Sequence, residues 1–572
     1  MDPVIVVGAG PVGLALSLAL ASQGVPSVVL DEGPGKEDPR PARTVVLRAD
    51  MAAMVERLGC ATLRDEGVRW VGWRSMRRKQ QMRHIELSLG LGDTESDDGG
   101  PAAPLHIPQH ALARGLRDAI AGQELIQLVT DARLDTIEQD ARAVTAHTRR
   151  PGATSGGTWW RGSHLVGCDG ARSTVRKLLS IRFPGRTAVE RHAVAALRTE
   201  LPWPGEALLH RQPPWRGGGE EVTARPLPDG VWRIDWLLPP RGDLVTPDAL
   251  VTRIRDTLAG WCGGTTPPYE LIDTGVHTLH HRLARRWRVD RVFLAGDAAH
   301  LLGAVGTQGL DEGLRDAENL AWKLAYAWHH GASDTLLDSY QSERRAAVAS
   351  RLRAADQSLP VLRGGGGLRT YLPGGSRSHD ALLTDGHLGR GPLGAPPAYP
   401  HSPLAPEDAG ASRSAVGTGA GAPVEDVRVT APDGTTVRLR DRLGRGRLLV
   451  VLVAPGTGVW DRRHWMSAGV MPRLAEAVQA LPVKAELLVT EAYPGAVAHT
   501  VLLVRPDGHL VASFGGVRPD ELYAAADATR GGKAEAAPVS EVSGVSGVSG
   551  KAAGVAPVKA APEKTDRTAD IN

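Results

Sequence analysis

Cysteine is scarce in this chain, which holds 3 cysteines in 572 residues. Cys60, Cys168 and Cys262 form neither a CxxC pair nor any spacing typical of metal ligands. An odd number of isolated cysteines also argues against a disulfide framework. We therefore expect ordinary buried thiols in a reducing compartment, which indicates a cytoplasmic protein, and we expect no metal site.

The chain also lacks a strong excess of charge of either sign. Its formal net charge is +3 at pH 7, from 67 basic and 64 acidic residues. Proteins that bind nucleic acids gather basic side chains that attract phosphate groups. The near balance of charge gives such a role no support, and no nucleic-acid partner is expected.

A third absence is local, because no charged residue occurs between Val4 and Leu30. A run of this length is long enough to be a membrane span. A spanning helix, however, would have to accommodate Pro11 and Pro26. A signal peptide would begin with a basic segment, whereas Asp2 opens this chain. Both interpretations are disfavoured, and we expect no membrane association.

The same run divides into a strand, a glycine-rich turn, a helix and a second strand. Val4–Val7 is rich in valine and isoleucine, and the turn sequence GAGPVG begins directly after it at Gly8. A helix of small and apolar residues follows from Leu14 to about Ser22, and the second strand ends at Asp31. This order is that of a dinucleotide-binding unit in its required context.

Each residue type in this unit has a physical task. Gly8 permits the tight turn, Gly10 lets the backbone approach a pyrophosphate, and Gly13 lets the helix pack closely on the sheet. The helix N-terminus offers free N–H groups and a positive dipole end to phosphates. Asp31 lies where a carboxylate can accept hydrogen bonds from ribose hydroxyls. The motif alone does not distinguish NAD from FAD.

Two downstream stretches resolve that ambiguity. Residues 164–181, HLVGCDGARSTVRKLLSI, read as a strand, the turn Asp169–Gly170 and a helix start. Residues 291–331 read as a strand, the turn Gly296–Asp297, a glycine-rich loop and a long amphipathic helix. With these motifs, roughly residues 1–360 resemble the single-component FAD-dependent aromatic hydroxylases, the para-hydroxybenzoate hydroxylase-like superfamily. The resemblance is closest to the 3-(3-hydroxyphenyl)propionate hydroxylases and the polyketide hydroxylases of antibiotic pathways.

The resemblance implies an α/β fold with several parts. These are an FAD-binding Rossmann-like domain of the glutathione reductase type (1–182 and 281–360, the second part with a long helix), a β-sheet substrate domain (183–280, with 68–107 as a candidate addition), a linker (361–421), a C-terminal thioredoxin-like domain without cysteines (422–529) and a disordered tail (530–572). A domain without cysteine cannot perform thiol–disulfide chemistry. The tail lacks bulky apolar residues, a composition typical of disorder.

The resemblance also implies which residues hold the cofactor, FAD. Asp297 would hold a ribitol hydroxyl, Arg43 would lie near the phosphates and the flavin, and Asp169 would lie beside the flavin. The N-terminus of the long helix would present N–H groups to the pyrimidine end of the flavin. The complete set of cofactor-binding candidates is Gly8, Gly10, Pro11, Val12, Gly13, Asp31, Glu32, Arg43, Gln109, Asp169, Asp297, Gly306, Gln308, Gly309 and Leu310.

The implied reaction is an NAD(P)H-consuming hydroxylation. NAD(P)H would visit as a transient co-substrate, because the sequence contains no second glycine-rich motif in a suitable context. Reduced FAD and molecular oxygen would form a flavin C(4a)-hydroperoxide, which transfers oxygen to a small aromatic or polycyclic polyketide-type substrate. Homo-oligomer formation stays open, and no catalytic residue can be named. Trp232, Trp236 and His210 are pocket candidates, although tryptophans at strand spacing more often form core. His280 and His281 suit structural or surface roles better.

Three departures from the family pattern motivate an alternative. The family usually has proline, glycine and asparagine where this chain has Ala304, Thr307 and Asp311. A carboxylate at Asp311 could cap the helix, but it would also oppose an anionic flavin nearby. An FAD-dependent reductase or dehydrogenase without oxygen insertion is therefore a second hypothesis. A third is a redox-silent flavoprotein that acts as a scaffold through its C-terminal unit.

Overall fold

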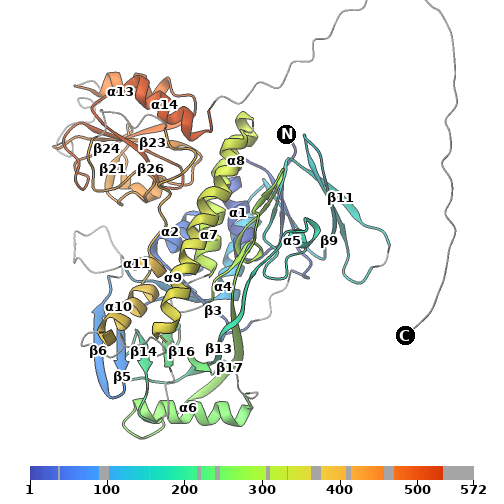
Figure 1. The fold of residues 1–572 in the computed structure, drawn as a ribbon, viewed down its shortest axis with the longest axis vertical. Helices are drawn as coiled ribbons and strands as arrows, with labels where there is room; N and C mark the ends of the chain where they lie inside the picture. The colour runs from blue at the N-terminus through green and yellow to red at the C-terminus, as the bar shows by residue number, and fades with distance from the viewer. Residues whose placement is uncertain are drawn as a thin grey trace, which may run out of the picture. The chain divides into compact units, whose positions relative to one another are not determined.

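The computed structural model describes residues 1–35, 39–88, 102–153, 155–215, 221–238, 245–303, 309–331, 333–362, 375–406, 414–456 and 469–532. The tail expected to be disordered lies outside these residues from position 533 onward. The described elements combine parallel and antiparallel sheets with helices packed on their faces (Figure 1). The predicted α/β class is therefore confirmed.

The first sheet has six strands, and the uncharged opening run forms its centre. In order across the sheet they are β18 (Arg288–Val289), β19 (Val292–Leu294), β12 (His164–Gly167), β1 (Val4–Val7), β2 (Ser27–Leu30) and β8 (Ile126–Val129). All neighbouring pairs are parallel except β18–β19. Every residue of β1, β2 and β12 is buried, as expected for strands covered on both faces.

The missing charge of the opening run follows from this burial. Helix α1 (Pro11–Ala21) packs against α4 (Gln109–Ala121) and α7 (Gly309–His330), and nine of its eleven residues are buried. A helix enclosed in this way is apolar all round. No helix in the described part of the chain has both the length and the apolar character needed to cross a membrane.

The second large sheet has eight strands. In order they are β20 (His300–Leu301), β17 (Glu270–Leu283), β13 (Gly185–Arg198), β16 (Val231–Leu238), β15 (Glu221–Pro226), β14 (Glu206–Arg211), β5 (Gly72–Arg77) and β6 (Gln80–Glu86). The last two strands come from the stretch 68–107 that was a candidate for this sheet. Helix α6 (Pro247–Trp261) covers one face (Figure 1), where Trp232, Ile234 and Trp236 pack against it.

A smaller sheet of three strands is formed by segments that occur in the sequence between strands of the two large sheets. β7 (Leu105–Pro108) pairs with β3 (Thr44–Leu47) and with β4 (Val68–Arg69). A further three-stranded sheet consists of β9 (Arg133–Gln139), β10 (Val144–Arg149) and β11 (Thr158–Gly162). In the chain, β3 and β4 lie between β2 of the first sheet and β5 of the second, whereas β9, β10 and β11 lie between β8 and β12 of the first sheet.

Part of the stretch 361–421, expected as a linker, is folded. After α9 (Ala346–Leu362), the chain forms α10 (Gly375–His387) and α11 (Gly391–Gly394). Leu383 and Leu388 are buried in one apolar cluster with Trp70 and Trp73 of the eight-stranded sheet region. The abundance of Gly, Pro and Arg predicted a loop, but these isolated leucines provide enough apolar surface to pack.

The C-terminal unit is a six-stranded mixed sheet. Its order is β22 (Thr436–Arg438), β21 (Arg428–Thr430), β24 (Ala485–Thr490), β23 (Leu448–Val453), β25 (Thr500–Val504) and β26 (Leu510–Gly515). Helices α13 (Met471–Gln479) and α14 (Pro519–Thr529) pack on it. Gly508 (φ 77°) lies in the turn of the β25–β26 hairpin.

A buried cluster of charges joins this unit to α7. Glu343, in the π-helical turn Gln341–Arg345, accepts hydrogen bonds from both terminal nitrogens of Arg505 (2.6 and 2.9 Å) and from Nζ of Lys323 (2.7 Å). Asn319 donates to Glu343 and to Asp507. Burial alone would raise the pKa of Glu343, but Arg505 and Lys323 outweigh burial and hold that pKa below its ordinary value. The carboxylate is therefore charged inside the protein.

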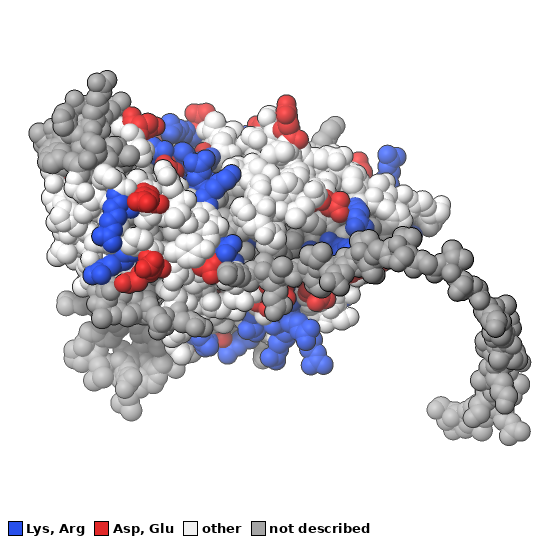
Figure 2. All heavy atoms as spheres, turned by 90° about the horizontal axis from the view of Figure 1, so that it is seen from above, with Lys and Arg blue, Asp and Glu red and all other residues white. Residues whose placement is uncertain are grey.

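Charge at the surface is mixed on the face shown in Figure 2, where cationic and anionic side chains are interspersed. One pair at the surface, Arg161 with Asp2, has an Nε–Oδ2 distance of 2.9 Å and side chains that are 59% and 42% exposed. Water and salt weaken such pairs, so they contribute little to stability. We therefore expect the buried cluster to contribute much more to the stability of the fold than this surface pair does.

Removal of the Glu343 carboxylate tests the importance of the buried cluster. We expect Glu343→Ala to lower the free energy of unfolding by about 3–5 kcal/mol, because Lys323 would lose its main counter-charge and Arg505 would keep only Asp507. The control Arg161→Ala should change it by less than about 1 kcal/mol. Urea denaturation of both variants measures the difference. Equal effects in the two variants would contradict the assigned role.

Candidate functional site

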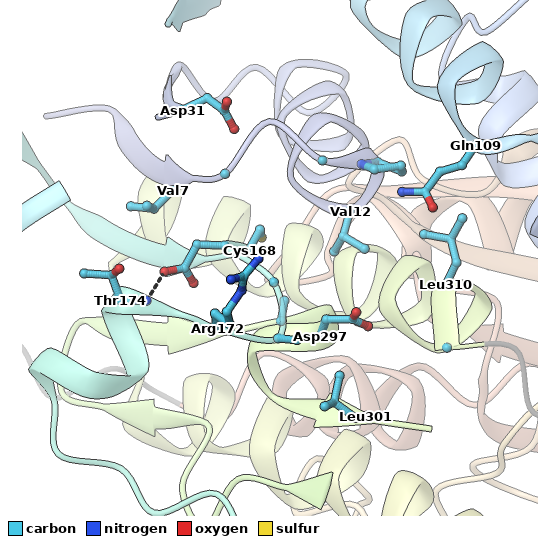
Figure 3. A pocket seen from close by; sticks show the side chains of 18 of the residues that line it. Val7, Val12, Asp31, Gln109, Cys168, Arg172, Thr174, Asp297, Leu301 and Leu310 are labelled. Atoms are coloured by element: carbon cyan, nitrogen blue, oxygen red, sulfur yellow. Dashed lines mark hydrogen bonds between the residues drawn. The ribbon is translucent and has the colours of Figure 1, made fainter. Parts of the chain in front are cut away.

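A cavity of about 610 Å³ opens where the strands of the first sheet end (Figure 3). The carboxyl ends of parallel strands share one edge, so their turns meet there. The predicted residues in its wall are Gly8, Gly10, Pro11, Val12, Asp31, Glu32, Arg43, Gln109, Asp169, Asp297, Gly309 and Leu310. Gly13 lies behind the wall, and Gly306 and Gln308 lie outside the described residues.

The three motif glycines are required for different reasons. A Cβ on Gly8 (φ +107°) would lie 2.5 Å from the Cys168 carbonyl oxygen, and one on Gly13 would lie 2.0 Å from the Gly8 carbonyl oxygen. Gly10 has an ordinary extended conformation (φ −75°, ψ 172°), and its Cβ would meet no protein atom within 4 Å. The fold itself thus requires Gly8 and Gly13. No described protein atom requires Gly10, so the space in front of it is open to a ligand.

Asp31 fixes the glycine-rich turn from the end of β2. Its Oδ2 accepts a hydrogen bond from the Ala9 N–H (2.6 Å), and its Oδ1 accepts one from the Gly33 N–H (2.8 Å). Each carboxylate oxygen has a second lone pair for a further donor. Asp31 lies in the cavity wall (Figure 3), so it can hold the turn and accept a ligand hydroxyl at the same time.

Asp169 has one satisfied and one unsatisfied oxygen. Its Oδ2 accepts hydrogen bonds from the N–H groups of Thr174 (2.6 Å) and Val175 (3.0 Å), at the start of α5 (Thr174–Leu178). Its Oδ1 is buried and has no hydrogen-bond partner among the described residues. Buried polar atoms nearly always have a partner. A ligand that offers a hydrogen-bond donor to Asp169 therefore fits the wall at this point. The open space in front of Gly10 is a second feature that suits a ligand.

Asp297 reaches the cavity from the turn after β19 (Figure 3). Its carboxylate is accessible within the cavity, yet the surrounding walls shield it from bulk solvent. This burial raises the pKa of Asp297 above its ordinary value, although His300 and Arg43 oppose the shift. The structure records no hydrogen bond from this carboxylate to another described residue. It is therefore available to a ligand.

A buried carboxylate that the sequence reasoning missed holds the Gly296–Asp297 turn in place. Oδ2 of Asp316 accepts a hydrogen bond from the Gly296 N–H (2.9 Å) and lies 2.7 Å from Nε2 of His300. Its Oδ1 accepts a hydrogen bond from Nε of Arg344 (2.8 Å). Asp316, His300 and Arg344 are all fully buried. Asp316 thereby fixes the turn that brings Asp297 to the cavity.

A signal for this network exists in the sequence of α7. Glu312, Asp316, Asn319 and Lys323 recur at helical spacing, and all four are buried. Long polar side chains on the buried face of a helix are rare unless they are paired. The stripe could have indicated an internal network, but not its partners. Arg344, for example, bonds to Glu312 and Asp316 from another helix.

Asp311, where the family usually has asparagine, is fully buried and paired. Its Oδ2 lies 2.9 Å from Nη1 of Arg48, and its Oδ1 accepts a hydrogen bond from the Arg48 N–H (3.3 Å). Burial raises the pKa of Asp311 to about 6, while Arg48 and Arg315 oppose the increase. Asp311 is not part of the cavity wall. Its negative charge is therefore paired with Arg48 and does not border the cavity. The other departures, Ala304 and Thr307, lie outside the described residues.

The aromatic and histidine candidates divide between core and cavity. Trp232 and Trp236 are core residues beneath α6. His210 is buried too: its Nδ1 accepts a hydrogen bond from Nε1 of Trp261 (2.9 Å). His281 is buried, with Nδ1 3.1 Å from Asp356. His280, for which a structural or surface role was expected, lines the cavity.

Neither metal ligands nor disulfides stand out in the described parts of the chain. Within them, no group of three or more His, Cys, Asp or Glu side chains is arranged to hold a metal ion. Cys60 and Cys168 are buried free thiols, and Cys262 is partly buried and also free. Burial raises the pKa of Cys168, and the nearby Asp169 adds to the increase. A thiol in this state is a poor nucleophile.

Solved structures of other proteins resemble this fold over nearly the whole chain. A flavin-dependent monooxygenase, PieE, solved in complex with FAD and substrate, superimposes with a TM-score of 0.71 at 21% identity, over 92% of this chain and 98% of that one. The rebeccamycin biosynthetic enzyme RebC, solved with reduced flavin, superimposes with a TM-score of 0.66 at 25% identity, over 93% and 99% of the two chains. These flavoproteins share the fold.

Curated relatives align with the part of the chain that builds the cavity. The 3-(3-hydroxy-phenyl)propionate/3-hydroxycinnamic acid hydroxylase of Paraburkholderia xenovorans (strain LB400) is 30% identical over 356 residues, 62% of this chain and 54% of that protein. Rifampicin monooxygenase of Streptomyces venezuelae is 33% identical over 362 residues, 60% of this chain and 68% of that protein. The chain thus matches little more than half the length of the first of these relatives. A family model described as an FAD binding domain matches residues 1–355. More than half of the chain fits that model, so the protein belongs to the FAD-binding-domain family, and its cofactor is FAD.

Proposed function

We propose that this protein is an FAD-dependent, NAD(P)H-consuming monooxygenase that hydroxylates an aromatic or polycyclic polyketide-type substrate. One observation carries the proposal: the dinucleotide turn and the eight-stranded sheet form the wall of one cavity. Thr278, Leu279 and His280 of β17 line it together with Gly10 and Asp297. A cofactor held by the turn would therefore face the sheet. The hydroxylase and monooxygenase relatives support the same reaction class.

The cofactor-binding roles follow from the wall of the cavity. We assign the Gly10–Val12 turn and the N-terminus of α1 to the pyrophosphate, because no side chain caps this helix. Asp31 and Glu32 would hold ribose hydroxyls, and Asp297 a ribitol hydroxyl. We assign Arg43, Gln109, Asp169, Gly309 and Leu310 to the remaining contacts with FAD. Bound FAD supplies hydride acceptance and oxygen activation, while the chain orients it and excludes water.

The co-substrate would bind without a domain of its own. The sequence contains no second dinucleotide motif in a strand–turn–helix context. We therefore propose that NAD(P)H visits the outer part of the same cavity, next to Asp169 and Arg172, which line it. The free thiols among the described cysteines support a reducing, cytoplasmic location for this chemistry.

We assign residues 422–529 to a thioredoxin-like domain without cysteines. Support comes from the central parallel pair β23–β24, the antiparallel strands β25 and β26, and the helices α13 and α14 on one face. The domain buries Trp322 and Tyr326 of α7 in its own apolar cluster. Without a thiol its role is structural. The FAD-binding domain would comprise 1–182 and 281–360, and the substrate domain 183–280 together with β5 and β6.

The free space in front of Gly10 leads to a specific prediction. Gly10→Val should lose most of its bound FAD, because the new side chain would occupy the place of the pyrophosphate. The free energy of unfolding of the apoprotein should stay within about 0.5 kcal/mol of the wild type, since a Cβ at this position meets no protein atom within 4 Å. Absorbance of the purified protein gives the FAD-to-protein ratio. Gly122→Val is the control: Gly122 is equally open at the end of α4 but lies outside the cavity. Full occupancy in Gly10→Val would refute the assignment.

Asp297 offers a second test, with opposite effects on binding and stability. Asp297→Ala should bind FAD at least about tenfold more weakly, a loss of about 1.4 kcal/mol. The raised pKa shows that burial disfavours the ionised carboxylate. Its removal should therefore leave the stability of the apoprotein at neutral pH unchanged or slightly increased. Asp297→Asn keeps a hydrogen-bond acceptor and should bind FAD more tightly than Asp297→Ala. FAD titration and urea unfolding measure the two effects, and wild-type affinity in Asp297→Ala would count against the role.

The reaction class is tested with a panel of phenols and polycyclic aromatic compounds. We expect substrate-stimulated NAD(P)H oxidation and, under isotopically labelled oxygen gas, one labelled oxygen atom in the product. NAD(P)H oxidation that yields an unlabelled, reduced or dehydrogenated substrate would instead support the reductase hypothesis, which the departures at Ala304 and Thr307 motivate. Bound FAD with no substrate-stimulated oxidation across the panel would support the scaffold hypothesis.

A further inference from the structure

Ionisable side chains form a row on the face of the eight-stranded sheet opposite α6. Leu279 of β17 lines the cavity and pairs with Glu190 of β13. Two residues further along the two strands, His277 pairs with His192, and His192 pairs on its other side with Leu237 of β16. Alternate residues of a strand project from the same face. The row therefore begins directly beside the cavity wall.

His192 and Glu190 form a histidine–carboxylate pair within this row. Nε2 of His192 lies 3.3 Å from Oε2 of Glu190; the side chain of Glu190 is 4% exposed, and that of His192 is 20% exposed. With Nε2 directed at the carboxylate, Nδ1 is the other ring nitrogen, and it has no hydrogen-bond partner among the described residues. A carboxylate that holds one nitrogen fixes the tautomer and stabilises the imidazolium when the other nitrogen takes up a proton.

The surroundings of this pair contain charges of both signs. The titratable and charged groups around it come from β14, β15, β16, β17, α10 and the loop before β3, and they are Arg211, Glu221, Arg225, Arg233, Asp235, His277, His387 and Arg43. Asp235 pairs with Arg225 (3.0 Å) and Arg233 (2.6 Å), so its single negative charge offsets one of those two positive charges. Burial, and then Glu190, raise the pKa of Glu221 to about 7.

The other histidines are less suited to accept a proton. Burial and Arg233 lower the pKa of His277, which makes it a weak base. Burial lowers the pKa of His387 to about 3. Neither ring has a carboxylate partner among the residues that the structure describes. Among the histidines around the row, His192 is thus the one held by a carboxylate next to the cavity.

We propose that His192, held by Glu190, removes the phenolic proton from a hydroxylated aromatic substrate seated on this row. The inference rests on the proposed monooxygenase function and deepens it by assigning a base and a substrate class. The O–H bond of the phenol breaks, its electron pair stays on oxygen, and the proton bonds to Nδ1 of His192. The phenolate ring is more electron-rich than the phenol and reacts more readily with electrophilic oxygen. His192 is then a catalytic residue, and Glu190 a positioning residue.

The test uses the FAD-loaded enzyme and para-nitrophenol, whose phenolate has its own colour. The apparent pKa of the bound probe is read from its absorbance across a pH series. In the wild type we expect this value about 1–2 units below that of the free probe, as for an acid beside a group that favours its charged form. His192→Gln should abolish the shift, and Glu190→Gln should reduce it. With a phenolic substrate, His192→Gln should also lower kcat by about 100-fold or more.

A matched histidine–carboxylate pair serves as the control. In the β9–β10–β11 sheet, Nδ1 of His147 also lies 3.3 Å from a carboxylate oxygen, of Asp135, and its side chain is 15% exposed. His147→Gln should leave the titration of the probe unchanged. The FAD-to-protein ratio shows that each variant is folded. If His192→Gln does not fold, Glu190→Gln carries the same test, because it keeps the shape of the side chain and removes its charge.

The outcomes separate this inference from the proposed function. An unshifted probe in the wild type, no binding of the probe, or a shift that survives both His192→Gln and Glu190→Gln would overturn the inference. Labelled product formed by His192→Gln at the wild-type rate and pH dependence would also overturn it, while the monooxygenase proposal would stand. A shift that depends on His192, in an enzyme that inserts no oxygen, would uphold the base and overturn the monooxygenase.

Discussion

The carboxylate of Asp316 is the interaction on which the cofactor site depends. It is fully buried, and its two oxygens bind the Gly296 N–H, His300 and Arg344. A buried carboxylate without partners would cost several kcal/mol. The Gly296–Asp297 turn, α7 and the helix that carries Arg344 must therefore come together as a set. Asp297 itself faces the cavity, because Asp316 binds the N–H of the preceding residue, Gly296, from the other side of the turn.

Arg344 extends this dependence beyond the FAD-binding part. Its guanidinium also binds Glu312 and the hydroxyl of Tyr399, which belongs to the stretch that looked like a linker. The carboxylate of the preceding residue, Glu343, accepts a hydrogen bond from Arg505 of the C-terminal unit. Two consecutive residues of one π-helical turn thus connect the cofactor turn with the rest of the chain. This connection gives a physical reason for a C-terminal unit that has no cysteine and no thiol chemistry.

The sequence predicted those parts of the site that depend on local geometry. The glycine-rich turn, Asp31 and the two Asp–Gly or Gly–Asp turns were recognisable, because their tasks are set within a few residues of a strand end. The residues that brace them were not. Arg48 and Asp311 are 263 residues apart, and nothing in their spacing indicates a pair. The row of His277 and His192 likewise exists only through strand register, which sequence alternation leaves undetermined.

Of the three departures from the family pattern, Asp311 now has a structural explanation that changes its bearing on the reductase hypothesis. A carboxylate at Asp311 was expected to oppose a negatively charged flavin. In the structure it lies behind the cavity wall and pairs with Arg48, whose backbone N–H it also binds. An asparagine could accept that backbone hydrogen bond but could not neutralise the buried guanidinium. Asp311 and Arg48 are therefore best understood as one compensated feature that braces the start of α7. The charge that argued against oxygen chemistry is cancelled within the protein, so Asp311 no longer favours the reductase over the monooxygenase.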